Sequence, residues 1–328
     1  MCGAGVESAR VPEKLTLFPP RGVARSFIFR EGRNHFAGRD PGSDLYMQDP
    51  RVSARHALFQ WTGSAGGWSL VDLRSKNGTF VNGARITDVP LQDGDWMSFG
   101  GLLAFFEHMS DEAVETFYAE RASRLEGAAA ARMALVPNVD PRAALRLVLA
   151  SALELLGAER GLIVLLDRAS AVHVAMASGL ARYEPLDQTF ETAFGAMKKV
   201  LEARKPVAAL DHQTHSAQGR RRSLQDMGKG ALACVPLSVA PWPRGLLYVD
   251  ARQLGGAFTD LDLEILSALA EHAALMLAGA SLPEPVRELV GAPPAGDNEE
   301  RHVLVQLDRK VSAWAARDLR AHRLTPIG

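Results

Sequence analysis

Short runs in which hydrophobic and polar residues alternate fill the first third of the chain, from residue 14 to residue 107. Two clear examples are HALFQW at residues 56–61 and WSLVDL at residues 68–73. Alternation with a period of two is typical of β-strands with one buried face. Glycines recur between the runs, and many short strands with frequent turns predict an all-β sandwich. We expect this sandwich to occupy residues 13–108, after a loose N-terminus of residues 1–12.

Polar residues gather in four blocks that fall on turns between the predicted strands. The blocks are, in order, Gly38-Arg39, Ser53-Ala54-Arg55-His56, Ser75-Lys76-Asn77-Gly78-Thr79 and Asn82-Gly83. If neighbouring turns meet at one end of the sandwich, these side chains form a compact set of hydrogen-bond donors. Such a set is suited to a phosphate group, although each residue could instead be an ordinary surface or turn residue.

The residue types in the blocks indicate separate tasks. Arg39 offers a planar fork that fits phosphate oxygens, and Ser53 can add a hydroxyl donor. Asn77 carries both a donor and an acceptor, so it can bind a peptide backbone. Arg55 and Lys76 would add positive charge beside the pocket, unless they are simply solvated loop residues.

In order and residue type, the four blocks resemble the forkhead-associated (FHA) family, over about residues 14–107. The resemblance implies a β-sandwich that binds phosphothreonine peptides. It implies phosphopeptide binding for Arg39, Ser53, Arg55, Lys76 and Asn77.

The same resemblance implies a structural role for the other residues of the blocks. His56 would tie the loops together rather than bind a ligand. The turn residues with structural roles are Gly38, Gly78, Asn82 and Gly83. Ala54 departs from the family pattern, because many relatives carry a polar side chain at this position, and the departure bears on affinity and target choice.

After Ser110 the composition and spacing become those of helices. We expect a linker helix within residues 109–138, with Ser110 as its N-cap. A partial apolar stripe along this helix consists of Val114, Phe117, Leu125 and Met133. The stripe is explained either by packing on neighbouring elements or by formation of a dimer.

Residues 139–281 predict a domain of the α+β class, so the whole chain is multidomain. Asp140 and Pro141 are typical of a helix start, and Gly157 of its end. Strands are expected at 161–166, 171–176, 207–210, 231–237 and 246–249, with a helix at 189–203. A final helix opens at Thr259, where Asp262 could complete a capping box.

This second segment resembles the GAF family. The matching residues are Ala158-Glu159-Arg160-Gly161, Val235-Pro236-Leu237, Gly245-Leu246-Leu247-Tyr248-Val249-Asp250 and Phe258-Thr259. The resemblance implies a GAF domain that dimerises or holds a small ligand. The residue pattern of the cyclic-nucleotide binders is absent, so we expect no identifiable cofactor and leave open an unidentified small ligand.

The bulk composition restricts the class of protein. The chain has 328 residues, 47% of them hydrophobic, and a net charge of −1, so no general attraction to nucleic acid or membrane is expected. Its two cysteines, Cys2 and Cys234, suit a reducing compartment. No apolar run is long enough to span a membrane. We therefore expect a cytoplasmic protein with no metal site.

Two further segments leave alternatives open. Residues 211–223 contain Asp211, His212 and His215 and then Arg220-Arg221-Arg222-Ser223. Their spacing is not a zinc pattern, which favours a polar loop over a metal or catalytic site. Residues 282–328 predict a proline-containing linker, expected to be mobile, followed by a helical tail with an apolar stripe at Leu304, Leu307, Val311 and Trp314.

The sequence as a whole favours a non-enzymatic regulatory protein. No nucleotide-binding loop, nucleophile elbow or kinase signature is present. The expected partner is a phosphothreonine-containing protein, a substrate of a Ser/Thr kinase, and the expected assembly is a homodimer. Two alternatives remain: a ligand-gated regulator that binds its own phosphorylated chain, and a regulatory fragment of a transcription activator without its ATPase domain.

Overall fold

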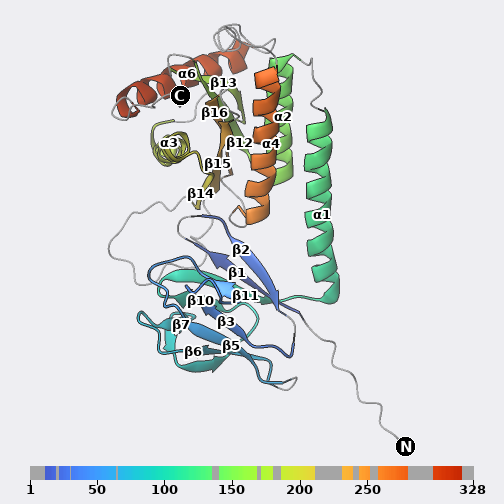
Figure 1. Cartoon of the computed structure of the whole chain (residues 1–328), viewed down its shortest axis with the longest axis vertical. Helices are drawn as coiled ribbons and strands as arrows, with labels where there is room; N and C mark the ends of the chain where they lie inside the picture. Colours follow the sequence, from blue (N-terminus) through green and yellow to red (C-terminus); the bar gives the residue numbers. More distant parts are fainter. Residues whose placement is uncertain are drawn as a thin grey trace, which may run out of the picture. The chain divides into compact units, whose positions relative to one another are not determined.

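The computed structural model comprises two compact units, Met1–Arg121 and Ala122–Gly328 (Figure 1). The residues that the structure describes are 12–19, 22–29, 31–63, 66–134, 140–167, 171–179, 186–210, 231–238, 244–251, 258–279 and 298–319.

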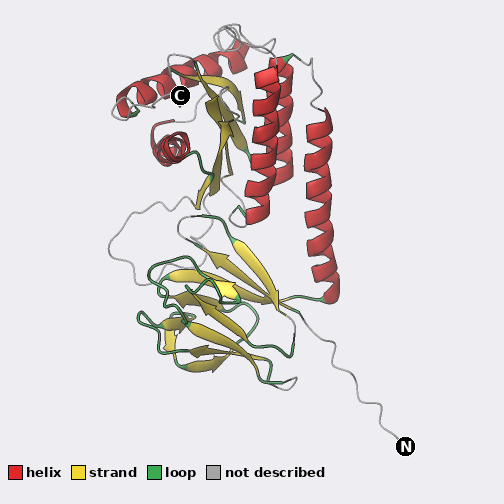
Figure 2. Cartoon of the chain, viewed as in Figure 1, coloured by secondary structure: helices red, strands yellow, loops and turns green. Residues whose placement is uncertain are grey.

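The first unit is a sandwich of two sheets, as the alternating pattern predicts (Figure 2). Its strands are β1 (Glu13–Phe18), β2 (Arg25–Phe29), β3 (His35–Gly38), β4 (Leu45–Tyr46), β5 (Ala57–Trp61), β6 (Trp68–Asp72), β7 (Thr79–Val81), β8 (Ala84–Ile86), β9 (Asp88–Pro90), β10 (Trp96–Phe99) and β11 (Leu102–His108). Among the described residues, one sheet has the order β2-β1-β11-β10-β7-β8 and the other β4-β3-β5-β6-β9.

The inward-facing residues of both sheets form one hydrophobic core. Leu15, Phe59, Leu70 and Phe106 are completely buried in it, and they alternate with less buried neighbours along their strands. Antiparallel pairing fixes the register, with Leu15 opposite Phe106 and Phe59 opposite Leu70. A slip by one residue would turn these side chains toward solvent, so the core specifies the register and thereby the loops at the strand ends.

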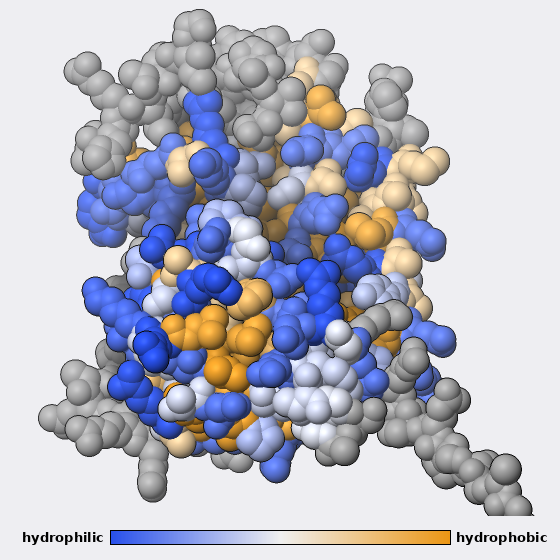
Figure 3. Space-filling view, turned by 60° about the horizontal axis from the view of Figure 1, so that its bottom comes forward, coloured by the Kyte–Doolittle hydropathy of each residue, from blue (hydrophilic) through white to orange (hydrophobic). Residues whose placement is uncertain are grey.

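The outward face of the smaller sheet is partly apolar. Phe36, Leu58 and Val71 lie opposite one another on β3, β5 and β6 and are half-buried. Figure 3 shows an apolar area bordered by hydrophilic residues on the face of this unit that comes forward.

The second unit is of the α+β class. Its elements are α2 (Pro141–Leu156), β12 (Arg160–Leu166), β13 (Val172–Ser178), α3 (Leu186–Ala203), β14 (Val207–Leu210), β15 (Ala231–Ser238), β16 (Arg244–Ala251), α4 (Asp260–Gly279) and α6 (Asn298–Asp318). The strands pair in the order β13-β12-β16-β15-β14, all antiparallel. Helices α2 and α4 cover one face of this sheet, and α3 and α6 lie on the other side (Figure 1).

Helix α6 packs into the core of the second unit. Leu307, Val311 and Trp314 are at most 6% exposed, and the Trp314 ring stacks on Phe194 of α3 with centroids 4.9 Å apart. Asp308 accepts the backbone N–H of Val174 at 2.8 Å, and the Ser312 hydroxyl donates to the Val172 carbonyl at 2.7 Å. Because β13 is an edge strand, α6 satisfies backbone groups that the sheet leaves unpaired.

The helix ends agree with the capping residues in the sequence. Asp140 accepts the backbone N–H of Ala143 at 3.2 Å, and Gly157 ends α2 with a φ of 60°. At the start of α4, Asp262 accepts the N–H and the hydroxyl of Thr259 at 2.6 and 2.7 Å. The predicted capping box is therefore present.

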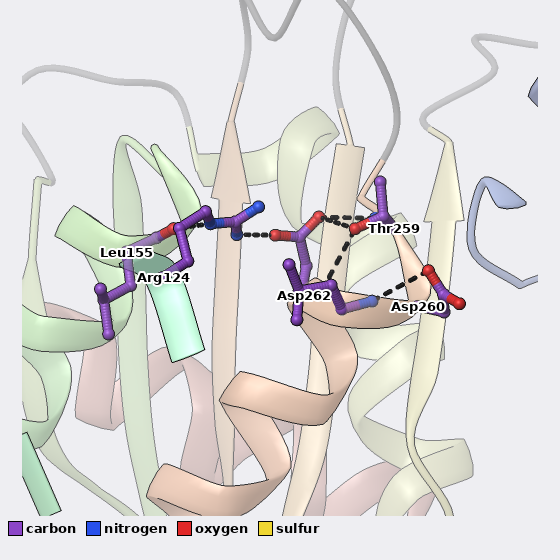
Figure 4. A network of polar contacts seen from close by, with 6 residues as sticks. Arg124, Leu155, Thr259, Asp260 and Asp262 are labelled. Atoms are coloured by element: carbon purple, nitrogen blue, oxygen red, sulfur yellow. Dashed lines mark hydrogen bonds and ion pairs between the residues drawn. The ribbon is translucent and has the colours of Figure 1, made fainter. Parts of the chain in front are cut away.

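Helix α1 (Asp111–Ala134) runs from the first unit into the second and is joined there to two helix ends. Figure 4 shows Arg124 between the last turn of α2 and the first turn of α4. Its Nε donates to the Leu155 carbonyl at 2.8 Å, and its terminal nitrogen pairs with Asp262. Arg124 therefore neutralises the negative end of one helix while it contacts the capping carboxylate of another.

These observations confirm a multidomain chain, with a β-sandwich followed by an α+β segment. The stripe expected on α1 is divided, because Val114 is buried while Leu125 and Met133 are 39% and 80% exposed. The predictions for residues 1–11, 211–230 and 280–297 fall outside the described residues. No described helix is long and apolar enough to cross a membrane.

Candidate functional site

Three loops of the sandwich meet and bond to one another. They are the loops at residues 39–44, 47–56 and 73–78, which follow β3, β4 and β6. The backbone N–H of Arg39 donates to the Ser53 carbonyl at 2.9 Å, and that of Asp40 donates to the Ala54 carbonyl at 3.0 Å. The N–H of Lys76 donates to Ser53 Oγ at 3.0 Å. Ser53 therefore lies at the junction of all three loops.

His56 is completely buried and supports this junction through two hydrogen bonds. Its Nδ1 accepts the backbone N–H of Ser53 at 3.0 Å, so Nε2 carries the proton and donates to the Gly78 carbonyl at 3.2 Å. Burial lowers the pKa of His56, and the bond to Gly78 opposes this only in part. A neutral imidazole with both nitrogens engaged has a structural role.

Arg39, Ser53 and Asn77 come from three different loops. Arg39 is exposed, and its Nε donates to the Val52 carbonyl at 3.2 Å, which leaves its two terminal nitrogens for an anion. Ser53 accepts a bond with its oxygen and keeps its hydroxyl hydrogen. Asn77 donates to the Arg51 carbonyl at 2.7 Å, so its side-chain oxygen remains an acceptor for an incoming peptide.

Arg55 and Lys76 are both exposed. The Arg55 guanidinium lies over the Phe36 ring, 4.3 Å from its centroid, and this contact holds the charge beside the loop. Lys76 is positioned by its backbone bond to Ser53. Both cations can therefore add to the positive potential around Arg39 without occupying the space between the loops.

Two glycines are required where loops approach closely. A Cβ on Gly38 would lie 2.0 Å from the Ala54 carbonyl oxygen, and Gly78 has a φ of 83°. Asn82 and Gly83 form the tight turn between β7 and β8, with φ values of 49° and 83°. Asn82 also donates to Asp95 at 2.7 Å and accepts the Trp96 N–H at 3.0 Å.

Two residues at the junction were not singled out from the sequence. Asp72 accepts the hydroxyls of Ser75 and Thr79, both at 2.6 Å, and shapes the third loop. Burial raises the pKa of Asp72, but these hydrogen bonds outweigh burial and hold it below its ordinary value. Arg85 on β8 lies against Gly78, whose added Cβ would be 2.8 Å from Arg85 Nε. The two-residue turn at Asn82-Gly83 was the signal that could have revealed Arg85.

The junction gathers neutral hydrogen-bond donors and cations from three loops. Among the described residues, no group of three or more His, Cys, Asp or Glu side chains could hold a metal ion.

Comparison with known families gives two matches in chain order. A family model described as an FHA domain matches residues 35–100, and one described as a GAF domain matches residues 138–278. The first match contains the three loops. The second match ends before α6.

Individual relatives match parts of the chain. The chain is 34% identical over 110 residues to the oxoglutarate dehydrogenase inhibitor of Corynebacterium jeikeium, which is 34% of this chain and 75% of that protein. It is 42% identical over 64 residues to the glycogen accumulation regulator GarA of Mycolicibacterium smegmatis, or 20% of this chain and 39% of that protein. The match to FhaA of Mycobacterium tuberculosis is 37% over 86 residues and covers 16% of that protein.

A solved FHA domain, described in terms of phosphothreonine-dependent FHA domain interactions, is also similar. It is 31% identical, covers 30% of this chain and 98% of the solved chain, and has a TM-score of 0.28.

Proposed function

The chain belongs to the FHA family and carries a GAF domain after its FHA domain, and from this premise we propose that it is a non-enzymatic regulatory protein. Its FHA domain binds phosphothreonine-containing segments of partner proteins, which are substrates of a Ser/Thr kinase. The names of the relatives support this proposal, because they include an inhibitor and a regulator. The similar solved domain is described by phosphothreonine-dependent interactions.

The observation that carries the proposal is the junction of three loops around Ser53. The loops of Arg39, Ser53 and Asn77 are held together by hydrogen bonds of the backbone and by the buried His56. Their donors are therefore in place before a ligand arrives. A preorganised site loses less free energy on binding than one that must order its loops.

The three side chains take different parts of the ligand. The Arg39 guanidinium pairs with phosphate oxygens, and the Ser53 hydroxyl donates to a third oxygen. The side-chain oxygen of Asn77 accepts a backbone N–H of the peptide. Phosphothreonine offers three acceptor oxygens and about −1.5 to −2 charges at pH 7, which matches a site of donors and cations.

Replacement of Arg39 tests this function. A charge-assisted hydrogen bond contributes roughly 1.5–3 kcal/mol, so Arg39→Ala should weaken binding of a phosphothreonine peptide by about 10- to 150-fold. Isothermal titration of wild type and variant with phosphorylated and bare peptides measures this. Arg33→Ala is the matched control, because Arg33 is an exposed arginine of the same domain that pairs with Asp44 at 2.8 Å. Equal affinity for phosphorylated and bare peptides would contradict the proposal.

For the GAF domain we propose dimerisation as the main role, with sensing of a small ligand as the alternative. Large hydrophobic side chains are exposed on helices of the second unit: Met133 by 80%, Leu275 by 54% and Leu147 by 37%. Exposed apolar side chains of this size favour a protein contact. A partner chain could also supply the phosphothreonine, and mass spectrometry of the purified protein for phosphothreonine distinguishes a self-binding regulator from an adaptor.

A further inference from the structure

The cations of the FHA domain fall into two groups. Lys14, Arg33 and Arg51 form ion pairs with Glu107, Asp44 and Asp49. In contrast, none of the described carboxylates forms an ion pair with the other cations of the three loops or with that of β8, namely Arg39, Arg55, Arg74, Lys76 and Arg85. One more described cation of the sandwich, Arg25, forms no ion pair. It donates to the Tyr46 carbonyl at 3.2 Å.

Three of these five cations, Arg74, Lys76 and Arg85, belong to the loop of Asn77 or lie against it. Lys76 directly precedes it, and Arg85 covers the Gly78 that follows it. Antiparallel pairing places Arg85 opposite Phe80, two residues beyond Gly78, so the long side chain reaches back along β7 to the turn. These charges therefore lie near Asn77, the residue proposed to bind the peptide backbone.

The backbone of Arg74 has an unusual conformation. Its φ is 56°, which lies in the left-handed region that residues other than glycine rarely adopt. Asp72 accepts the backbone N–H of Ser75 at 3.1 Å and the hydroxyls of Ser75 and Thr79, which fixes the loop on both sides of Arg74. The oxygens of Asp72 are therefore engaged by neutral donors, and the Arg74 side chain remains exposed.

The nearby carboxylates do not cancel this charge. Asp49 pairs with Arg51 at 2.7 Å. Asp40 lies beside Arg39 in the first loop, where it accepts the Gly42 N–H at 2.9 Å. One phosphate group would engage Arg39 and Ser53, so Arg74, Lys76 and Arg85 remain for a second anionic feature of the ligand.

We propose that Arg74, Lys76 and Arg85 form a cationic flank that selects phosphothreonine segments carrying Asp or Glu beside the phosphothreonine. The inference rests on the proposed phosphothreonine binding and specifies its ligand class, an acidic phosphopeptide. Exposed ion pairs are weak, so each acidic residue strengthens binding by about 2- to 5-fold. The effect decreases as salt is added, because the Debye length is about 8 Å at roughly 0.15 M ionic strength.

Three peptides with the same phosphothreonine and with acidic, alanine or lysine flanks test this flank by titration against the full chain. Wild type should prefer acidic over alanine flanks by at least about 5-fold, and lysine flanks should bind most weakly. A double variant, Arg74→Asn with Arg85→Gln, should reduce the preference to within about 2-fold. Its affinity for the alanine-flanked peptide should stay close to that of wild type. Asparagine is chosen at position 74 because it tolerates a positive φ.

A double variant on α3, Lys198→Gln with Lys199→Gln, is the charge-matched control and should retain the full preference. Two results would contradict the cationic flank but not the proposed function. One is phospho-dependent binding with no preference among the three peptides, and the other is an unchanged preference in the Arg74/Arg85 variant. Failure of all three phosphopeptides to bind wild type would instead overturn the proposed function and the flank with it.

Discussion

At the scale of single residues, the loops of the FHA domain depend most on His56. Removal of its imidazole leaves the Ser53 N–H and the Gly78 carbonyl without partners in a buried position. Each unsatisfied group costs about 1–3 kcal/mol, so His56→Ala should lower the free energy of unfolding of this domain by roughly 2–5 kcal/mol.

Phosphopeptide affinity should fall together with this stability, because the loops lose their common support. Hydrogen exchange of loop amides and denaturant unfolding measure the two effects. A variant with wild-type stability and weak binding would instead indicate a direct role in the ligand site.

The lowered pKa of His56 also predicts a dependence on pH. In the unfolded chain the imidazole takes up a proton near its ordinary value of 6.5, whereas in the folded domain burial makes protonation harder. The unfolded state therefore binds more protons below that pH, and the stability of the domain should fall as the pH drops from 6.5. Denaturant titrations between pH 7.5 and about pH 5 measure this, and a His56→Gln variant should show a flatter profile. An equal slope in both proteins would exclude His56 as the cause.

Candidate site residues could be proposed from the sequence where local spacing indicates them. Arg39, Ser53 and Asn77 follow strand ends in a fixed order, and the structure brings their loops together. Arg85 was missed because its contact with Gly78 depends on hairpin register rather than on a block of polar residues. The role of Asp72 in shaping the third loop was missed because carboxylates at strand ends are common. Only its hydrogen bonds with the hydroxyls of Ser75 and Thr79 reveal that role.

At the scale of elements, α6 makes the clearest prediction. Trp314 is 6% exposed and stacks on Phe194, so Trp314→Ala should destabilise the GAF domain by about 3–5 kcal/mol. Val305→Ala on the same helix should change stability by less than about 0.5 kcal/mol, because Val305 is 47% exposed. Thermal unfolding of both variants gives the comparison. An unaffected Trp314 variant would show that α6 does not contribute to the stability of the domain.

Helix ends and helix contacts differ in how well the sequence predicts them. Asp140, Gly157, Thr259 and Asp262 act within three or four residues of their own helix, so their roles could be read directly. The partners of Arg124 lie 31 and 138 residues away, and no local pattern indicates such a contact. For the same reason, the stripe on α6 predicted a helix but not the sheet on which that helix packs.

At the scale of the whole molecule, the exposed apolar side chains of the second unit predict a dimer. Met133, Leu147 and Leu275 lie on α1, α2 and α4 and are 80%, 37% and 54% exposed. Full burial of an exposed side chain of this size is favourable by about 1.5–3 kcal/mol, so each of these partly exposed side chains would contribute less than this before the costs of association. Light scattering at tens of micromolar should give twice the mass of one chain. Met133→Glu with Leu275→Glu should return the protein to a monomer. A wild-type protein that is a monomer at this concentration would contradict the expectation.

The position of α6 along the chain has a consequence for biosynthesis. Ser312 bonds to a strand residue made 140 residues earlier. Translation at roughly 5–20 residues per second leaves β13 and the adjoining apolar face uncovered for about 7–30 s. During that time the nascent GAF domain presents an open sheet edge to other chains and to chaperones. The domain therefore completes its fold only after α6 has emerged from the ribosome.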